Sequence, residues 1–461
     1  MRVLFATAEL APLARVGGLA EAASGLVRAL RTLDVEVDVV LPDYSGVALE
    51  GEVEVPVSVP WWVGAARVRR GNHPLAGPIT LVEVEGIGRP HPYVDERGAG
   101  WPDNDHRFMA FSAVVAALAR ADRPDVLHLN DWHTAAVAGL LDDPPPTVLT
   151  IHTLGYQGVM DAAWLAHLAV GTERFQWYGG VNPLAGAIET VDRVIAVSPN
   201  YAAEIVTPEA GMGLHERLAA LGHRLVGIRN GIDTTVWHPA DDPHLAANYD
   251  AGDLTARRAC RTALMGDAGW EEDRRPVAAM VTRLVEQKGV DLLLDAVPFL
   301  ARLPLRLAVL GSGDAELTAQ LQAAAVAQPD LIWFTNGYDE PLAHRLFAGA
   351  DLFVMPSRFE PCGLAQMQAM TYGAPPVVTD VGGLHDTVID VDTHRQSGTG
   401  VVSASVDAAG LVDALHRAVR AIGHPARRAA IQRRGMAQDW SWANPARRHL
   451  EVYREAIDDR R

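Results

Sequence analysis

The chain contains almost no lysine. Lys288 is the only lysine among 40 Lys+Arg residues in a chain of 461, so all the other side chains in that count are arginine. An ammonium on a flexible stem binds phosphate as a point charge or, when deprotonated, forms a Schiff base, and a planar guanidinium does not replace it freely in either role. A chance survivor on a solvated surface is the alternative. The surroundings of Lys288 decide between these interpretations.

Cysteine is scarce, and long apolar runs and basic tracts are missing. Cys260 and Cys362 are too few for a disulfide framework or a structural zinc cluster. No apolar run reaches the ~18 to 20 residues of a membrane span, and Met1–Phe5 resembles a first strand more than a signal peptide, so we expect a cytoplasmic protein. The formal charge of −17 argues against nucleic acid as the main partner. An anionic ligand would need a local cluster of cations.

Strand-length apolar runs recur along the chain, each followed by a segment with helical spacing. This alternation is typical of parallel α/β architecture. The clearest predicted strands are Val3–Ala8, Val35–Leu41, Val126–Leu129, Thr147–Ile151, Arg193–Val197, Val277–Val281, Leu307–Leu310, Leu331–Thr335, Leu352–Met355 and Pro376–Val378. Ten such units are more than one sheet of ordinary size holds, so we predict two doubly wound domains.

A polar, proline-containing stretch at 238–243 interrupts the series of strands and predicts the linker. The predicted domains are residues 1–238, enlarged by a β-rich excursion at about 52–85, and residues 239–440. A last helix within 441–461 is expected to pack back on the first domain. Ligands of doubly wound folds bind at the carboxyl ends of the strands, so we expect a cleft where the two domains face each other.

Two glycine turns lie between a predicted strand and a predicted helix. The loop after the first strand runs from Glu9 through Arg15 to Gly17 and Gly18, and paired glycines at a helix start can present amides to a phosphate while Arg15 adds charge. Plain turn chemistry explains these glycines equally well. For the second turn, at 311–314, close packing of the backbone is a sufficient explanation.

Further polar residues follow strands in both halves. Asp131, His133 and His152 come at the ends of neighbouring predicted strands, so their side chains should meet at one edge of the sheet. In the second half, Glu360 lies in an apolar strand-to-helix loop, where a carboxylate can accept hydrogen bonds from sugar hydroxyls or simply cap the helix. The histidine spacing does not fit zinc, and the Asp390-Val391-Asp392 pattern is assigned to a surface loop, so no metal site is predicted.

The ordered set of motifs resembles the bacterial glycogen synthases and plant starch synthases. The resemblance covers nearly the whole chain. Its motifs are Arg15-Val16-Gly17-Gly18-Leu19, Asp131-Trp132-His133-Thr134, Ile151-His152-Thr153-Leu154-Gly155-Tyr156-Gln157-Gly158, Ser198-Pro199-Asn200-Tyr201-Ala202, Asn230-Gly231-Ile232-Asp233, Arg283-Leu284 with Gln287-Lys288-Gly289, Gly337-Tyr338-Asp339-Glu340, Glu360-Pro361-Cys362-Gly363-Leu364, Gly382-Gly383-Leu384-His385-Asp386-Thr387-Val388 and Trp440-Ser441-Trp442.

The resemblance implies the glycosyltransferase-B fold, with two Rossmann-like domains, and an enzyme that transfers glucose from ADP-glucose to the non-reducing end of an α-1,4-glucan with retention of configuration. No bound metal or organic cofactor is implied, and glycogen or another α-1,4-glucan is the acceptor. Neither nucleic acid nor membrane is expected as a partner. The reaction class fits the scattered cations of an acidic chain, because a nucleotide sugar needs only a local anion site.

Roles for individual residues also follow from the resemblance. Arg283 and Lys288 would hold the diphosphate, and Arg15 with the Gly17 and Gly18 amides would approach it from the other domain. The remaining implied roles are hydroxyl binding by Glu360, a lining of the glucose and acceptor site by His152 and Asp131, stacking near adenine by Tyr338, and further substrate contacts by Glu9, Cys362, Gly363 and Leu364.

Several positions depart from the family pattern. Arg15 stands in place of the usual lysine, Glu21 in place of aspartate and Ala20 in place of glycine. Ala185 stands where lysine is common, Thr153 where asparagine is usual and Ala365 where threonine is usual. Lys288 is retained against this loss of lysines, which favours a role for it. The departures affect donor affinity and acceptor handling more than reaction class.

Three other functions remain open. The enzyme could use UDP-glucose or a small acceptor, since no residue identifies the base. Lys288 could anchor pyridoxal phosphate in a glucan phosphorylase, although the residues beside it do not resemble that site. The chain could also be a glucan-binding or regulatory protein that has lost turnover, which the changes at Arg15, Ala185 and Thr153 would permit.

Overall fold

The computed structural model describes residues 1–460 and divides into two compact units. Unit 1 comprises residues 1–231 together with the chain from Trp442 onward, and unit 2 comprises residues 232–441. The prediction placed the boundary at 238/239 and the start of the last segment at 441. The segment at 238–243 therefore belongs to unit 2, because its side chains are anchored there: buried Asp242 is held by His344 and Tyr372.

Unit 1 is built on a nine-stranded sheet in the order β12-β11-β7-β6-β1-β2-β5-β4-β3. Pairing is parallel from β12 to β5 and antiparallel from β5 to β3. The strands are β1 (Arg2–Ala6), β2 (Glu36–Pro42), β3 (Glu50–Glu54), β4 (Ala66–His73), β5 (Gly77–Val84), β6 (Val126–Asn130), β7 (Thr147–Ile151), β11 (Arg193–Ala196) and β12 (Leu225–Gly227). The strand order turns back between β1 and β6, which makes their carboxyl ends the switch point of the sheet.

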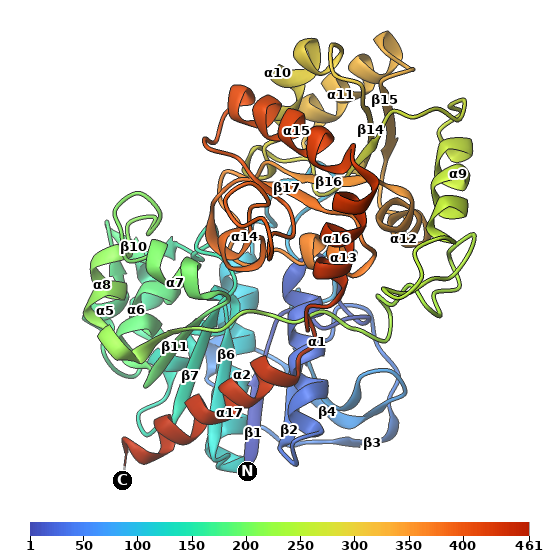
Figure 1. The fold of residues 1–461 in the computed structure, drawn as a ribbon. Helices are drawn as coiled ribbons and strands as arrows, with labels where there is room; N and C mark the ends of the chain where they lie inside the picture. Colours follow the sequence, from blue (N-terminus) through green and yellow to red (C-terminus); the bar gives the residue numbers. More distant parts are fainter. Residues whose placement is uncertain (461) are drawn as a thin grey trace. The chain divides into compact units, whose positions relative to one another are not determined.

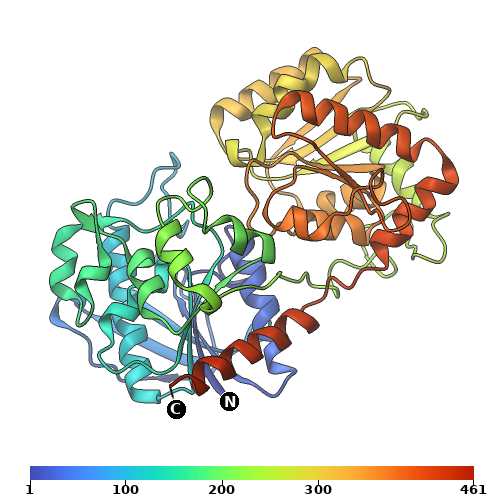
Figure 2. The same ribbon diagram turned by 60° about the vertical axis from the view of Figure 1, so that its left-hand side comes forward.

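Helices cover the sheet of unit 1 (Figures 1 and 2). They are α1 (Gly18–Arg31), α2 (Asn104–Asp122), α3 (Trp132–Ala135), α4 (Val137–Leu140), α5 (Thr172–Phe175), α6 (Pro183–Thr190), α7 (Pro199–Glu204), α8 (His215–Ala220) and α17 (Ala443–Asp458), with the short turns η1 (Trp61–Val63), η2 (Ala162–His167) and η3 (Gly222–Arg224). A second small sheet contains β8 (Met160–Asp161), β10 (Gly180–Val181) and β9 (Gln176–Trp177).

Unit 2 has a six-stranded parallel sheet in the order β15-β14-β13-β16-β17-β18, which is the Rossmann order 3-2-1-4-5-6. Its strands are β13 (Val277–Val281), β14 (Arg306–Gly311), β15 (Ile332–Asn336), β16 (Leu352–Met355), β17 (Pro376–Val378) and β18 (Val401–Val402). Its helices are α9 (Arg257–Asp267), α10 (Val290–Leu300), α11 (Ala315–Ala327), α12 (Glu340–Gly349), α13 (Ala365–Thr371), α14 (Gly382–Thr387), α15 (Ala408–Ile422) and α16 (Pro425–Met436), with the turn η4 (Glu286–Lys288). The switch point here lies between β13 and β16.

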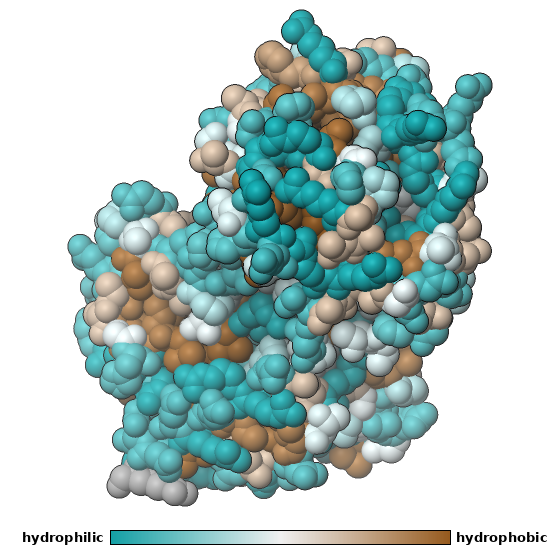
Figure 3. Space-filling model, in the orientation of Figure 1, coloured by the Kyte–Doolittle hydropathy of each residue, from teal (hydrophilic) through white to brown (hydrophobic). Residues whose placement is uncertain are grey.

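The central parallel strands of each sheet are buried because they are continuous apolar runs, as parallel strands covered on both faces require. In unit 1, β1 and β6 are almost wholly buried, and in unit 2 every residue of β14 is buried. Separate apolar clusters fill the two units. On the face drawn in Figure 3, hydrophilic residues predominate over scattered apolar ones. Among residues 1–460, no helix combines the length and apolar character of a membrane span.

The ten predicted strands are all confirmed, with ends that differ by at most about two residues. The β-rich excursion at 52–85 is also confirmed, and it extends the main sheet as β3 to β5. The short strands β8, β9, β10, β12 and β18 were not predicted, since two or three residues carry no periodicity.

The last helix, α17, lies on unit 1 beside α1, β6 and β7, far along the chain from all three (Figures 1 and 2). Its inner face carries Val452, Tyr453 and Ala456, none of which is exposed. The predicted return of the chain's end to the first domain is therefore what the structure shows, and the period of apolar residues in α17 is the physical reason.

Candidate functional site

The predicted residues gather at the switch points of the two sheets. In unit 1, the loop from Thr7 to Gly17 follows β1, and Asp131 follows β6. In unit 2, Arg283 follows β13, and the loop with Glu360 follows β16. Ligands of doubly wound folds bind at such points because loops diverge there and leave helix N-termini exposed.

Glu9 organises the loop that precedes α1. Its side-chain oxygen Oε2 accepts hydrogen bonds from the backbone amides of Val16 and Gly17, both at 2.9 Å, and Oε1 accepts one from the Tyr93 hydroxyl at 2.8 Å. Glu9 is 4 % exposed. Both oxygens therefore hold protein groups, so the carboxylate fixes the shape of the loop. The predicted substrate contact of Glu9 stays a prediction.

Arg15 forms an ion pair with Glu21, with 2.9 Å between Nε and Oε1. Both side chains are partly exposed, and Glu21 lies in the first turn of α1. A Cβ atom built on Gly17 or Gly18 would meet nothing within 4 Å, so the space beside these glycines is open. Two of the departures from the family pattern thus contact each other, and the open start of α1 lies next to them.

Asp131 is held in an unusual backbone conformation. Its φ is 54°, a region that residues with a Cβ seldom adopt, and its Oδ1 accepts the His152 amide at 2.7 Å. Burial raises the pKa of Asp131 to about 7, and hydrogen bonds from the His152 and Thr153 amides oppose that rise. The side chain is 5 % exposed, so this carboxyl group is a positioned acceptor that also titrates near neutral pH.

His152 is partly buried next to Asn130. Its Nε2 lies 3.0 Å from the Asn130 Oδ1, and the Asn130 Nδ2 donates to the carbonyl of Ala6 at 2.9 Å. Burial lowers the pKa of His152 to about 3, with His449 as a smaller cause, so the ring is neutral at neutral pH. A neutral imidazole at this position can form hydrogen bonds with sugar hydroxyls but contributes no positive charge.

His133 faces the same region and is also neutral. Its ring stacks on Tyr93 with centroids 4.7 Å apart, and burial lowers its pKa to about 3. Tyr93 thus contacts both His133 and Glu9. The Asp131 carboxylate contacts the backbone of residue 152, whose amide it accepts, and the convergence of the Asp131, His133 and His152 side chains stays a prediction.

In unit 2, Lys288 forms an ion pair with Glu360. The Lys288 Nζ lies 2.5 Å from the Glu360 Oε2, to which the Ser357 hydroxyl also donates at 3.1 Å. The side chains are 16 % and 5 % exposed, respectively. Lys288 is therefore a specific partner in an enclosed pair, and the interpretation as a chance surface residue is wrong.

The backbone holds this pair together through two interlocked loops. Gly289 has a φ of +67°, and a Cβ on it would lie 2.0 Å from the Pro356 carbonyl oxygen, so only glycine fits. The Arg358 amide donates to the Gln287 carbonyl at 2.8 Å. The segments at 286–289 and 356–360 are therefore joined through their backbones.

Arg283 has an exposed side chain. Within residues 1–460, its guanidinium has no hydrogen-bond or ion-pair partner. An arginine in this state at a strand end is ready for an anionic ligand, since binding would displace only water.

The loop at 362–364 is tied down by Gln366, which is fully buried in α13. The Gln366 Nε2 donates to the carbonyls of Cys362 and Gly363 at 3.1 and 3.0 Å. The helix that follows Leu364 is thereby held close to Glu360. Direct substrate contacts of Cys362, Gly363 and Leu364 stay predictions.

Tyr338 lies in the loop after β15 and is 61 % exposed, with its hydroxyl donating to Glu340 at 3.0 Å. An exposed ring can stack on a base, but its role near adenine stays a prediction. The second glycine turn is explained by packing: a Cβ on Gly311 or Gly313 would collide with the carbonyl oxygens of Thr282 or Leu284.

The Asp390 and Asp392 carboxylates are occupied by arginines. Arg417 pairs with both, at 2.7 and 2.9 Å, and Arg427 pairs with Asp392 at 2.9 Å. These bonds hold a structural turn. In the part of the chain that the structure describes, no group of three or more His, Cys, Asp or Glu residues could hold a metal ion.

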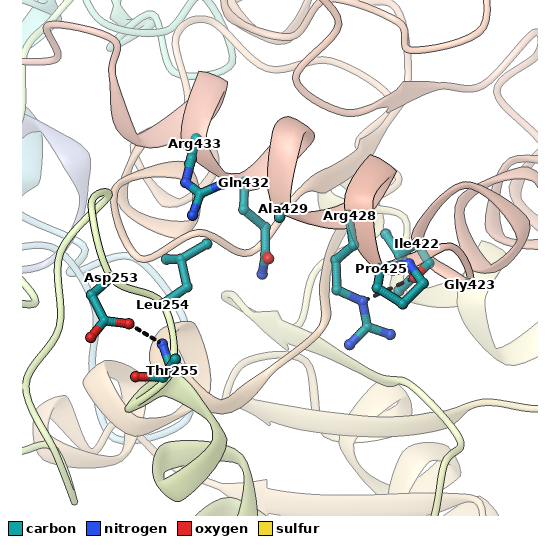
Figure 4. Close-up of a pocket in the computed structure, with 10 residues that line it drawn as sticks. All are labelled: Asp253, Leu254, Thr255, Ile422, Gly423, Pro425, Arg428, Ala429, Gln432 and Arg433. Carbon is teal, nitrogen blue, oxygen red and sulfur yellow. Dashed lines mark hydrogen bonds between the residues drawn. The ribbon is translucent and has the colours of Figure 1, made fainter.

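The pocket drawn in Figure 4 lies elsewhere in unit 2, between residues 253–255 and the helices α15 and α16. Its two arginines are engaged within the protein, Arg428 with the carbonyl of Ile422 and Arg433 with that of Ala251. None of the predicted site residues lines this pocket. It is therefore not the candidate site.

Three residues that support the site were not predicted: Tyr93, Asn130 and Ser357. Tyr93 and Asn130 bind partners that are remote in sequence, Glu9 and His152. Ser357 carries an ordinary hydroxyl group, and its bond to Glu360 has no signal in the sequence. Asn130 could have been found, since it directly precedes Asp131 at a strand end. Nothing in the sequence relates Tyr93 to Glu9, which lies 84 positions away.

Comparison with known proteins identifies the family of both units. Residues 2–220 match the model described as the starch synthase catalytic domain, and residues 267–433 match that of the glycosyl transferases group 1. The chain is 44 % identical to a glycogen synthase from Halorhodospira halophila, with 100 % of both chains covered. It is 40 % identical to glycogen synthase 1 of Methylococcus capsulatus, with 99 % of this chain and 97 % of that protein covered.

Solved structures agree with this result. The catalytic domain of starch synthase IV from Arabidopsis thaliana, bound to ADP and acarbose, superposes with a TM-score of 0.89 at 31 % identity, with 99 % of each chain covered. A sucrose-phosphate synthase from Thermosynechococcus elongatus, 18 % identical with a TM-score of 0.64, shares the fold. The chain belongs to the glycogen synthase and starch synthase family of glycosyltransferases and has the glycosyltransferase-B fold.

Proposed function

We propose that this protein is a glycogen synthase, which transfers glucose from ADP-glucose to the non-reducing end of an α-1,4-glucan with retention of configuration. The observation that carries the proposal is the Lys288–Glu360 pair at the switch point of unit 2, with the partner-free Arg283 at the neighbouring strand end. The full-length similarity to glycogen synthases and to a starch synthase that binds ADP supports the donor and the acceptor.

Unit 2 supplies the charges that the leaving group needs. As the bond between glucose and the diphosphate breaks, negative charge grows on the phosphate oxygens, and Lys288 and Arg283 stabilise that charge more strongly than they stabilise the bound donor. Glu360 orients the Lys288 ammonium and accepts hydrogen bonds from glucose hydroxyls. In unit 1, Arg15 and the start of α1 are the corresponding anion-binding elements.

Unit 1 supplies uncharged hydrogen-bonding groups for sugar. Neutral His152 and buried Asp131, fixed to each other through the backbone amide of residue 152, line the place of glucose and of the incoming 4-hydroxyl group. The oxygen of the acceptor 4-hydroxyl group forms the new bond to the anomeric carbon as the bond to the diphosphate breaks, and the hydroxyl proton passes to an oxygen of the departing diphosphate. No protein nucleophile and no bound metal or organic cofactor is proposed.

The deciding experiment measures ADP release from ADP-glucose with and without glycogen, beside UDP-glucose at the same concentration. Release that depends on glycogen and on the adenine donor is expected. Faster release of UDP from UDP-glucose than of ADP from ADP-glucose would favour the UDP-glucose alternative. Release of the nucleotide only when a small sugar is present would favour a small acceptor. Glycogen binding without release from either donor, in folded protein, would refute turnover and favour a regulatory role. The cytoplasmic location stays a prediction.

A further inference from the structure

A line of buried hydrogen bonds connects the last helix of the chain to Thr150, two residues before His152. The Tyr453 hydroxyl of α17 lies 2.6 Å from the Nδ1 of His128 on β6, and the Nε2 of His128 lies 2.7 Å from the Oγ1 of Thr150 on β7. Tyr453, His128 and Thr150 are at most 3 % exposed. These bonds join α17 to two strands that both end in the candidate site.

A second bond of the same geometry follows next along the strands. Asn130 and Thr150 are register partners of the parallel pair β6 and β7. Side chains two residues apart share a face of a strand, so His128 and Asn130 lie on one face of β6, and His152, directly after the end of β7, continues the face that carries Thr150. His128–Thr150 and Asn130–His152 are thus two successive diagonal rungs, and the second ends on the predicted catalytic residue.

The Asn130–His152 bond determines which nitrogen of His152 carries the proton. Because the Asn130 amide nitrogen donates to the Ala6 carbonyl, its oxygen faces His152 and can only accept. The Nε2 of a neutral His152 ring must therefore be the donor, which leaves Nδ1 as the acceptor of the ring. The tautomer is fixed by the neighbouring strand.

The rungs also control position. The Thr150 carbonyl accepts a hydrogen bond from the Asp131 amide at 2.9 Å. The Asp131 carboxylate in turn accepts a hydrogen bond from the amide of His152. A shift of Thr150 would therefore move both Asp131 and His152. The Thr150 side chain is anchored by His128, and the His128 ring is held by Tyr453 and stacked near His449, also on α17.

We propose that Tyr453, His128, Thr150 and Asn130 form a positioning ladder, in which the C-terminal helix fixes Thr150 and thereby the orientation of His152, while Asn130 sets the tautomer of that ring. This inference rests on the proposed role of His152 in glucosyl transfer. If the ladder is correct, α17 contributes to the geometry of the site, and the Tyr453 hydroxyl group affects turnover independently of the packing of the helix.

Removing single hydroxyl groups tests the ladder. Tyr453→Phe keeps the ring and Thr150→Val keeps the shape, so each deletes one hydrogen bond. One such bond is worth about three- to tenfold in a rate constant. Each variant should lower kcat by that factor and leave KM for ADP-glucose within about twofold. Because both act on one ladder, the double variant should lose less than the product of the single losses.

The matched control is Val452→Ala, which loosens the same helix at a fully buried apolar position beside Tyr453. It should lower the unfolding temperature at least as much as Tyr453→Phe while kcat stays at the wild-type value. Equal loss of kcat in Val452→Ala would show that only helix docking matters and would overturn the proposal, as would unchanged kcat in both hydroxyl variants.

His152→Ala separates this proposal from the proposed function. A loss of turnover by orders of magnitude in His152→Ala, together with unchanged Tyr453→Phe and Thr150→Val, would refute the ladder and leave the site intact. Near-normal turnover in folded His152→Ala would overturn the role of His152, and the ladder would fall with it.

Discussion

Replacing Lys288 by methionine should reduce stability and activity through different causes. Methionine keeps most of the apolar stem and removes the charge, which leaves the Glu360 carboxylate enclosed with the Ser357 hydroxyl as its remaining side-chain partner. The attraction at 2.5 Å is about 7 kcal/mol at an effective dielectric constant near 20, but desolvation of both ions offsets much of it.

The cost of leaving one buried charge unpaired is larger than the net value of the pair. Truncating one partner of a buried ion pair typically costs about 3 to 5 kcal/mol, and we expect the lower end because the Lys288 side chain is 16 % exposed and water can enter. For a unit of this size, about 3 kcal/mol corresponds to a fall of roughly 6 to 12 °C in unfolding temperature. The protein should remain folded.

The double variant Lys288→Met with Glu360→Gln separates the two effects. It removes both charges, so stability should return to within about 1 kcal/mol of wild type, whereas turnover should stay lower by orders of magnitude. The assays are urea unfolding and glycogen-dependent ADP release. Arg345→Met, which breaks a single ion pair with the partly exposed Asp267, is the control and should cost under about 1 kcal/mol.

Two results would refute this reasoning. Unchanged stability in Lys288→Met would show that Glu360 is solvated or protonated without its partner. Recovery of turnover in the double variant would show that Lys288 serves only to neutralise Glu360, and the assignment of a phosphate-binding role would be wrong.

Three further predictions concern charge and pH. Arg15→Lys should change KM for ADP-glucose only modestly. Because the two side chains pair, Glu21→Asp should partly restore KM in the double variant. The KM values of wild type, both single variants and the double variant test this, and additive effects would show that the two residues act independently. For Asp131, the folded pKa of about 7 exceeds the unfolded value, so the native state binds the extra proton between about pH 4 and 7 and this group's stabilisation is lost as pH rises. Asp131→Asn should therefore give a free energy of unfolding that rises more steeply with pH over this range, and an unchanged slope in urea unfolding at pH 5 and 7.5 would contradict the raised pKa. Activity should survive EDTA, since Asp390 and Asp392 are bound by arginines; loss that added divalent cation restores would reopen the question of a metal.

The fold was predictable because its signals are local. Each buried parallel strand is an apolar run such as Leu352–Met355, and each run is followed by a helical pattern, so their order along the chain gives the architecture. Strand ends then indicate the site, since carboxyl ends of parallel strands share one edge. Asp131 and Glu360 are located by this rule, whereas the role of Arg283 follows only from the family resemblance.

The contacts within the site were not predictable, because they join residues remote in sequence. Lys288 and Glu360 are 72 positions apart, and only the interlocking of their two loops brings them together. The Tyr453–His128 bond spans 325 positions and depends on how α17 packs. The ion pair of Arg15 and Glu21 is a different case, because the two residues are only six positions apart and both depart from the family pattern. Their contact was still not predictable, because it depends on the conformation of the turn between them.

That ion pair joins two of the positions at which the sequence departs from the family pattern expected from the resemblance. The chain carries a formal charge of −17, and burial keeps His133 and His152 neutral, so the histidines of the site do nothing to offset the charge of a diphosphate. Any neutralisation of a diphosphate would therefore depend on a few arginine and lysine side chains. Replacement of the usual lysine by Arg15 keeps one of them, and the longer Glu21 in place of aspartate reaches the larger guanidinium at 2.9 Å and holds it beside the open start of α1. Ala185, in contrast, is fully buried in α6, where a lysine would have to extend its ammonium out of an apolar environment. The cation Arg15 thus lies next to the open start of α1, whereas Ala185 lies where the surroundings are apolar.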